Sequence, residues 1–215
     1  MTEAVIFDMD GVLIDSELIY LMWLTEYLER KGYGVDKVQL ERTIGLSSKL
    51  TAERMEKIYG SGTGRALWED FLKTTEDYPL DYNDILFDGI KELMEYLDEK
   101  RLGLAIASAS PRAEIEEMLA CTGLNQQIQI VLSGEEFEKS KPNPEIYLAA
   151  AKKLGVDIKN CIVIEDSEYG IAAGKRAGAY VIARREERFA CCQERADKIV
   201  NDIAELYSFL VRILS

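Results

Sequence analysis

The chain has 215 residues, which is enough for one core of ordinary size or for a core with one small inserted domain. Hydrophobic residues make up 47% and charged residues 30% of the sequence, a composition typical of a globular protein and not of a disordered chain. The formal net charge is −13, which argues against general nucleic-acid binding or docking on an anionic membrane. The sequence has no histidine, and this excludes Ser-His-Asp catalysis, Cys-His catalysis and zinc sites that use histidine.

The four cysteines, Cys121, Cys161, Cys191 and Cys192, show no CxxC spacing of the kind used for metal or redox chemistry. The chain begins Met-Thr-Glu, with an acidic residue where a signal peptide is basic, and its longest apolar runs have the length of strands. We therefore expect a cytoplasmic, monomeric protein with reduced thiols and no membrane segment.

Five short apolar runs rich in Val, Ile and Ala alternate with amphipathic stretches of helical length. This alternation predicts an α/β fold, with a Rossmann-like parallel sheet covered by helices on both faces. The predicted strands are residues 4–7, 102–107, 128–132, 161–164 and 180–183.

The gap between the first two predicted strands is far longer than a single crossover helix needs. The intervening sequence shows helical apolar patterns, of which the first includes Leu18, Met22 and Leu28 and ends at Gly32. We therefore expect an α-helical cap inserted into the core. The expected bounds are 1–14 with 83–215 for the core and 15–82 for the cap.

The strongest local feature is the sequence Asp8-Met9-Asp10-Gly11, directly after the first predicted strand. In an extended chain residues i and i+2 face the same way, so Asp8 and Asp10 both point into the crevice beyond the strand end. Gly11 then allows the backbone to turn sharply. The alternative is that these acids only cap a helix.

A second acidic pair, Glu165-Asp166, follows the fourth predicted strand. Such residues are also common helix caps, and Asp166 or Ser167 could hold the amides of the next helix. If the first and fourth strands are neighbours, however, four carboxylates meet, and each like-charge pair costs up to about 4 kcal/mol at about 4 Å. A cation is then needed, and ligands that are all oxygen select a hard ion, which in a phosphate-handling site is Mg²⁺.

Two further loops carry polar side chains at the predicted sheet edge. Ser108 lies at the tip of the second strand, where its hydroxyl can donate to a ligand, whereas Ser110 before Pro111 is interpreted as a helix N-cap. Lys141 lies in a loop that is stiffened by the two prolines that follow it, Pro142 and Pro144, which would hold its ammonium in place. A carboxylate nucleophile, a second carboxyl, a hydroxyl, an ammonium and a cation are the parts that phosphoryl transfer requires.

In these motifs the chain resembles the haloacid dehalogenase superfamily, in the branch with a helical cap that contains phosphoglycolate phosphatase-like enzymes, sugar phosphatases and β-phosphoglucomutase. The resemblance covers the whole chain and keeps the family's order and spacing. The four matching motifs are the segment from Asp8 to Val12, then Ser108, then Lys141, then the pair Glu165 and Asp166.

The resemblance implies a core sheet ordered 5-4-1-2-3, with the active site between strands 1 and 4. It also implies that Asp8 attacks phosphorus to form an aspartyl phosphate and that Asp10 acts as general acid and then general base. Ser108 and Lys141 are expected to bind the phosphoryl group, helped by the amides around Met9 and Gly11.

For the metal, the resemblance implies that Mg²⁺ is held by Asp8, by the backbone carbonyl of Asp10 and by Asp166. It leaves open whether Glu165 is a direct ligand or lies one shell further out. The expected substrate is a small phosphorylated metabolite.

Several reactions of the superfamily have to be distinguished. The true dehalogenases and the phosphonoacetaldehyde hydrolases lack the second aspartate of the first motif, so Asp10 argues against both. β-Phosphoglucomutases typically carry a His after that motif and an Arg early in the cap, where this chain has no His and only Lys49 nearby. The favoured function is therefore an Mg²⁺-dependent phosphatase of a small phosphorylated metabolite, with a sugar-phosphate mutase as the alternative.

A third possibility is a regulatory protein that binds a phosphorylated metabolite without turnover. A lost motif residue would favour it, and none is lost here. In the cap, Tyr20 and Lys49 are candidates for contact with the substrate, although packing of the aromatic ring and solvation of the ammonium are the default interpretations.

Overall fold

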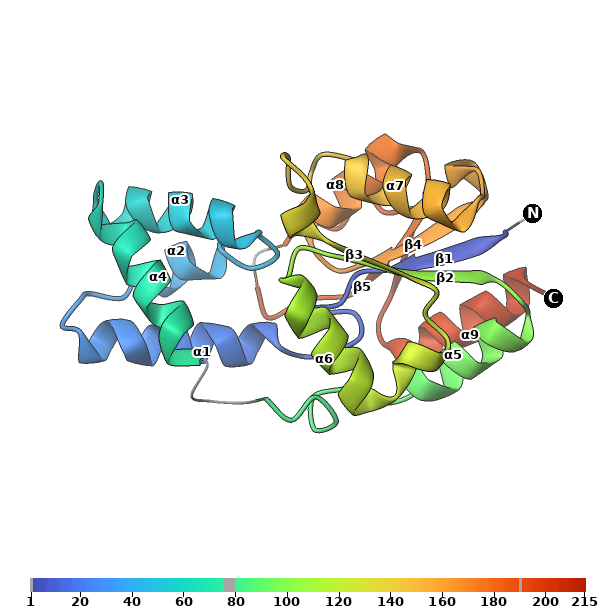
Figure 1. The fold of residues 1–215 in the computed structure, drawn as a ribbon, viewed down its shortest axis with the longest axis horizontal. Helices are drawn as coiled ribbons and strands as arrows, with labels where there is room; N and C mark the ends of the chain where they lie inside the picture. The colour runs from blue at the N-terminus through green and yellow to red at the C-terminus, as the bar shows by residue number, and fades with distance from the viewer. Residues whose placement is uncertain (1, 76–79, 190) are drawn as a thin grey trace.

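The computed structural model describes residues 2–75, 80–189 and 191–215 (Figure 1). Within these ranges the core is a six-stranded sheet in the order β3-β2-β1-β4-β5-β6, and every neighbouring pair of strands is parallel. The strands are β1 Ala4–Phe7, β2 Gly103–Ser108, β3 Ile130–Ser133, β4 Cys161–Glu165, β5 Tyr180–Arg184 and β6 Lys198–Val200.

Helices cover both faces of this sheet (Figure 1). One face carries α5 Ile90–Glu99, α6 Arg112–Thr122 and α9 Ile203–Ile213, and the other carries α7 Glu145–Leu154 and α8 Glu168–Ala177. Short 3₁₀ turns are formed by η1 Leu124–Gln126, η2 Gly134–Glu136 and η3 Ile158–Asn160.

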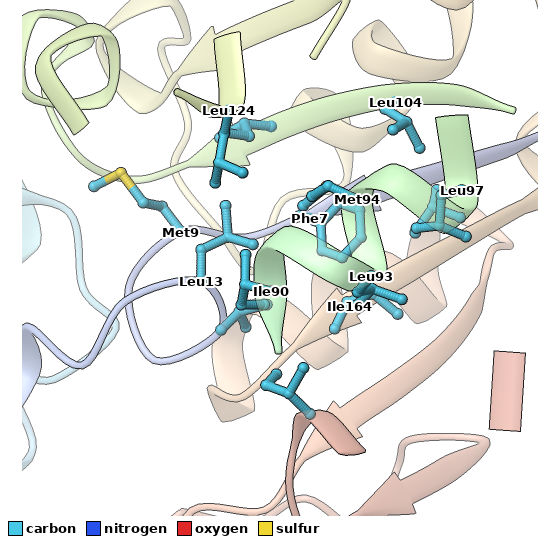
Figure 2. Packing of buried hydrophobic residues seen from close by; sticks show 14 of the residues in the cluster. Phe7, Met9, Leu13, Ile90, Leu93, Met94, Leu97, Leu104, Leu124 and Ile164 are labelled. Carbon is cyan, nitrogen blue, oxygen red and sulfur yellow. The ribbon is translucent and has the colours of Figure 1, made fainter. Parts of the chain in front are cut away.

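Alternation of side chains along β1 builds the two halves of the core. Val5 and Phe7 face the cluster formed with α5, α6 and α9, while Ala4 and Ile6 face the cluster formed with α7 and α8. Figure 2 shows Phe7 among Leu93, Met94 and other side chains of α5 and the sheet. Because β1 is buried on both faces, it reads as a continuous apolar run, as central parallel strands do.

The predicted α/β class and the strand order 5-4-1-2-3 are confirmed. The sixth strand was missed because β6 is only three residues long, too short to show a pattern in the sequence. It extends the predicted sheet beyond β5. No helix in the described part of the chain has the length and apolarity needed to cross a bilayer.

Of the described helices between β1 and β2, the first four form a bundle beside the sheet (Figure 1). They are α1 Glu17–Arg30, α2 Lys37–Glu41, α3 Ser48–Tyr59 and α4 Thr63–Thr75. The bundle has its own hydrophobic cluster, which includes Leu28, Met55 and Phe71. The expected cap bounds of 15–82 stay a prediction, and residues 76–79 of that range lie outside the described residues.

The apolar stripe predicted for the first cap helix is partly wrong. Leu18 and Met22 are 37% and 61% exposed, and the side chains of α1 that are buried include Leu24, Tyr27 and Leu28. The reason is that α1 packs on the bundle along its C-terminal half, while its N-terminal half reaches the junction with the sheet, where Glu17 is buried instead.

Candidate active site

The site lies where the carboxyl ends of β1, β2 and β4 meet, next to the helical insertion. This is the edge at which an open parallel sheet binds ligands, because the connections from β1 to its two neighbours run in opposite directions there. The structure brings the predicted motif side chains together at this edge, namely Asp8, Asp10, Ser108, Lys141, Glu165 and Asp166.

The ammonium of Lys141 joins two carboxylates. Lys141 Nζ lies 2.9 Å from Asp8 Oδ1 and 2.7 Å from Glu165 Oε1, and the lysine is only 5% exposed. The hydroxyl of Tyr147, on α7, donates to the same Glu165 oxygen at 2.6 Å. Burial lowers the pKa of Lys141, but its two carboxylate partners outweigh that effect and raise it, so the ammonium stays charged.

Glu165 is held at both oxygens. Besides the two donors to Oε1, Oε2 accepts from the backbone amides of Asp166 and Ser167 and from the Ser167 hydroxyl, at 3.0–3.1 Å. Burial alone raises the pKa of Glu165, but Lys141 and these donors lower it overall. A carboxylate whose oxygens are both engaged favours the outer of the two positions that the sequence left open.

Asp166 has the opposite environment. Among the described residues its Oδ1 is buried without a hydrogen-bond partner, and carboxylate oxygens of Asp8, Glu165 and Asp166 lie within 4.8 Å of one another. Burial, followed by neighbouring carboxylates, raises the pKa of Asp166 well above its usual range and that of Asp8 to about 7. A cluster with excess negative charge and an unpaired carboxylate oxygen fits a hard divalent cation held by Asp8 and Asp166.

The turn after β1 closes directly over this cluster. Gly11 has a φ of +71°, and a Cβ at this position would lie 2.0 Å from Asp166 Oδ2. Only glycine avoids both the left-handed strain and the clash. Gly11 therefore lets the chain pass close to the carboxylates that would hold the cation.

Three serine hydroxyls hold Asp10. Ser110 Oγ donates to Asp10 Oδ2 at 2.5 Å, Ser108 Oγ lies 3.4 Å from the same oxygen, and Ser16 donates to Asp10 Oδ1. The N-cap assigned to Ser110 was wrong, because α6 begins at Arg112 and the cap position is Pro111. The spacing of Ser108 and Ser110, two residues apart at a strand end, is the signal that could have placed both hydroxyls in the crevice.

The backbone around Met9 and Gly11 was expected to help bind the phosphoryl group. The amide of Gly11 donates to the carbonyl of Ile14 at 2.8 Å, so it is used within the turn and not turned to a phosphoryl group. The carbonyl of Met9 accepts from Leu13, and the Met9 side chain belongs to the hydrophobic core (Figure 2). Ser108 is fully buried and also accepts from the amide of Ser110 at 3.0 Å.

A cavity of about 160 Å³ opens between this edge and the helical insertion. It is lined by Asp8 and Asp10 from the sheet side and by Tyr20 from α1. Lys49, the other predicted contact, is exposed on α3 and does not line the cavity. The volume of the cavity suits a small ligand and not a macromolecule.

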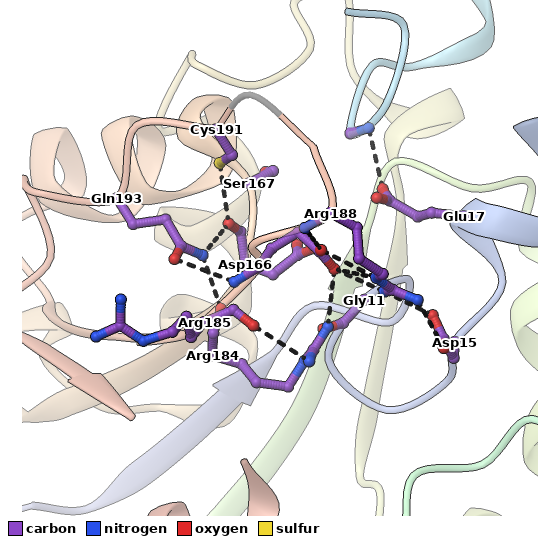
Figure 3. Close-up of polar contacts among 12 residues, drawn as sticks. Gly11, Asp15, Glu17, Asp166, Ser167, Arg184, Arg185, Arg188, Cys191 and Gln193 are labelled. Carbon is purple, nitrogen blue, oxygen red and sulfur yellow. Dashed lines mark hydrogen bonds and ion pairs between the residues drawn. The ribbon is translucent and has the colours of Figure 1, made fainter. Parts of the chain in front are cut away.

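The segment that follows β5 makes polar contacts with residues around the site, as Figure 3 shows. The guanidinium of Arg188 pairs with both oxygens of Asp15 at 2.8 and 2.9 Å. Gln193 Nε2 donates to the backbone carbonyls of Asp166 at 2.6 Å and of Arg184 at 2.7 Å. These contacts could not be predicted from the sequence, because they join residues far apart in the chain and follow no motif.

Comparisons with known proteins show the family of the chain. A family described as haloacid dehalogenase-like hydrolase matches residues 5–184. The phosphorylated carbohydrates phosphatase of Thermotoga maritima is 31% identical over 179 residues, which cover 82% of each chain. Hexitol phosphatase B of Escherichia coli is 31% identical over 176 residues, or 81% of this chain and 79% of that one.

The fold is shared with a β-phosphoglucomutase from Clostridium difficile, whose crystal structure aligns with a TM-score of 0.81 at 24% identity, over 100% of this chain and 97% of that one. The family match spans the strands that carry the motif residues and ends at the last residue of β5. On these grounds the chain belongs to the haloacid dehalogenase-like hydrolases.

Proposed function

We propose that this protein hydrolyses small phosphomonoesters, sugar phosphates among them, in an Mg²⁺-dependent reaction through an aspartyl phosphate on Asp8. The observation that carries the proposal is that Asp8 and Asp10 line one cavity in different environments: Asp8 faces the Lys141 ammonium and Asp10 faces serine hydroxyls. Two carboxyls with separate roles are what a nucleophile and a general acid require. The relatives named above, both phosphatases, support the same reaction.

In the first half-reaction, an oxygen of Asp8 forms a bond to phosphorus while the bond from phosphorus to the leaving oxygen breaks. Asp10 gives its proton to that oxygen, and the alcohol departs. Lys141, at 2.9 Å from Asp8, offers positive charge to the non-bridging oxygens. In the second half-reaction, Asp10 takes a proton from water, whose oxygen attacks phosphorus and releases phosphate from Asp8.

Mg²⁺, when bound by Asp8, Asp166 and the Asp10 carbonyl, supplies positive charge against the charge that develops on the phosphoryl oxygens. Glu165 then serves to orient Lys141, since its oxygens are already engaged. A sugar-phosphate mutase is the rival reaction, because the fold is shared with a β-phosphoglucomutase. Absence of His from the whole chain argues against it.

Phosphate release tests the proposal. Purified protein is incubated with sugar, nucleotide and short-acid phosphates, with Mg²⁺ or with EDTA, and Asp8→Asn is compared with the exposed control Asp88→Asn. We expect release that needs Mg²⁺, is lost in Asp8→Asn and is unchanged in Asp88→Asn. Near-native turnover of Asp8→Asn would refute the covalent route, and conversion of β-glucose 1-phosphate to glucose 6-phosphate without release would favour the mutase.

A further inference from the structure

The position of Asp10 shows where a leaving group has to lie. As the proton donor, Asp10 must be next to the leaving oxygen, and Asp10 lines the 160 Å³ cavity at the junction of sheet and insertion. The rest of the leaving alcohol therefore extends into this cavity. Its walls select the substrate.

All the charged side chains that line this cavity, among the described residues, are acidic. Beyond Asp8 and Asp10, they include the carboxyls of Glu17 and Glu114, and within the described residues no Lys or Arg lines the cavity. Most of the remaining wall is aliphatic or aromatic, including Tyr20, Leu21, Leu24, Trp68, Phe71 and Leu72.

Glu17 offers a free acceptor to whatever enters. Glu17 is the first residue of α1 and is only 8% exposed. Its Oε1 accepts from the Gly45 amide at 3.1 Å (Figure 3), while its Oε2 is buried and has no hydrogen-bond partner among the described residues. A buried oxygen without a donor is costly, so a donor on a bound ligand would be favoured there.

Glu114 stands on the first turn of α6, close enough to Asp10 for the two charges to interact. Partial burial, and then the negative charge of Asp10, raise the pKa of Glu114. Glu114 therefore adds a carboxyl beside Asp10 to a wall that has no cationic side chain among the described residues. An anionic substituent on the leaving group would add further negative charge there.

Two arginines nearby serve a different cavity. Arg42 and Arg54 line a neighbouring cavity that contains Asp166 and not Asp10, and Glu17 and Ile44 line both. Glu17 and Ile44 thus belong to the wall that the two cavities share, and neither arginine lines the cavity that contains Asp10.

We propose that the leaving alcohol carries hydroxyl or ammonium donors and no second anionic group, and that Glu17 and Glu114 select it. This rests on the proposed function and narrows it to phosphomonoesters of neutral or cationic polyols. Bisphosphates and phosphorylated sugar acids are disfavoured, because like charges close together in a partly buried cavity repel strongly. A mutase that passes through a bisphosphate is disfavoured for the same reason.

Three linear six-carbon substrates test the idea, because they differ only at C1. Sorbitol 6-phosphate carries a hydroxymethyl group there, glucamine 6-phosphate an ammonium and 6-phosphogluconate a carboxylate. We expect kcat/KM for 6-phosphogluconate to be about tenfold or more below that for sorbitol 6-phosphate, with glucamine 6-phosphate equal to sorbitol 6-phosphate or better. The dissociation constants of all three for Asp8→Asn, measured by calorimetry in magnesium buffer, should follow the same order.

A charge reversal locates the effect. Glu114→Lys should raise the ratio of 6-phosphogluconate to sorbitol 6-phosphate activity by about tenfold or more. Glu117→Lys is the matched control, since Glu117 is exposed on the same helix, does not line the cavity and gives the same change in net charge. It should leave the ratio unchanged.

The outcomes separate the two proposals. Equal kcat/KM and equal binding for 6-phosphogluconate and sorbitol 6-phosphate would overturn the inference and leave the phosphatase proposal standing. If the dissociation constants follow the predicted order but no substrate releases phosphate, the inference would be supported and the proposed reaction overturned. The same shift in Glu117→Lys as in Glu114→Lys would show that net charge, and not the cavity wall, sets the preference, and would also overturn the inference.

Discussion

Ser110 and Asp10 are joined by a hydrogen bond of 2.5 Å that ties the loop after β2 to the turn after β1. Ser16 holds the other oxygen of Asp10, so the carboxyl is fixed from two sides. The catalytic acid that we propose therefore owes its orientation to hydroxyls from the sheet edge and from the start of the helical insertion.

Ser110→Ala removes one of these supports. Hydrogen bonds to charged groups contribute about 1.5–3 kcal/mol, so we expect kcat to fall by about tenfold to a hundredfold with little change in KM. Steady-state phosphate release measures both constants. Ser208→Ala, which loses a hydroxyl on the exposed side of α9, is the control and should match the native enzyme; an unchanged kcat in Ser110→Ala would contradict the role of the bond.

Glu165→Gln tests whether this residue acts through Lys141. The change keeps the shape but removes the charge that holds the ammonium 2.7 Å away, so Lys141 should pair more tightly with Asp8 and make it a poorer nucleophile. Loss of such a supporting contact typically costs about 10–100-fold in activity. Tyr147→Phe removes only one hydrogen bond to the same carboxylate and should cost much less. Equal losses in kcat for the two variants would argue against orientation by charge.

Gly11→Ala probes the close approach of the turn to Asp166. The new Cβ would meet Asp166 Oδ2 at 2.0 Å, whereas Gly32→Ala has a similar φ of +79° and nothing within 4 Å. Each change carries a left-handed backbone penalty of about 1 kcal/mol, and Gly11→Ala should cost clearly more. Thermal or urea unfolding measures the difference. Equal losses would mean that the turn relaxes without disturbing Asp166.

The carboxylate cluster predicts how stability changes with pH. The pKa of Asp8 is raised from 3.8 to about 7, first by burial and then by Glu165. Between these values the folded chain keeps a proton that the unfolded chain has lost, so this group's contribution to the free energy of unfolding falls as pH rises from about 4 to about 7. A bound cation offsets that loss, since binding to the folded state alone adds about 2.7 kcal/mol at a hundredfold excess over Kd.

Melting temperatures in EDTA and in Mg²⁺ at about pH 5 and about pH 7.5 test this expectation. The increase caused by Mg²⁺ should be larger at the higher pH, where the ligands are ionised. Asp166→Asn should abolish the increase and raise the melting temperature in EDTA, because it relieves repulsion around a buried carboxylate. A stabilisation by Mg²⁺ that is independent of pH and survives Asp166→Asn would place the cation elsewhere.

The sequence predicts the part of this protein that depends on local patterns. Runs such as 4–7 and 161–164 show as strands because they are buried on both faces, and the motif pairs Asp8 with Asp10 and Glu165 with Asp166 mark their carboxyl ends. Parallel pairing then brings these ends to one edge. The chemistry of the site is therefore largely visible in the sequence.

The remaining features depend on tertiary placement that no local pattern encodes. Tyr147 reads as an apolar helix residue, yet its hydroxyl meets Glu165. Glu17 reads as a surface acid at a helix start, yet the insertion buries it against Gly45. Ser110 resembles a cap because Pro111 follows it, but the direction of its hydroxyl is fixed by the turn at the end of β2.

The central claim is that Asp8 carries the phosphoryl group between the two half-reactions. Acid quenching of the native enzyme within the first turnovers of sorbitol 6-phosphate, followed by peptide mass analysis, tests it most directly. Asp10→Asn is quenched in the same way with p-nitrophenyl phosphate, whose nitrophenolate leaves without a proton, so that only the second half-reaction is slowed. We predict one added phosphoryl group on the peptide that contains Asp8, and none in Asp8→Asn. Steady phosphate release from sorbitol 6-phosphate with no phosphorylated peptide in either the native protein or Asp10→Asn, or with the group on another residue, would contradict the account.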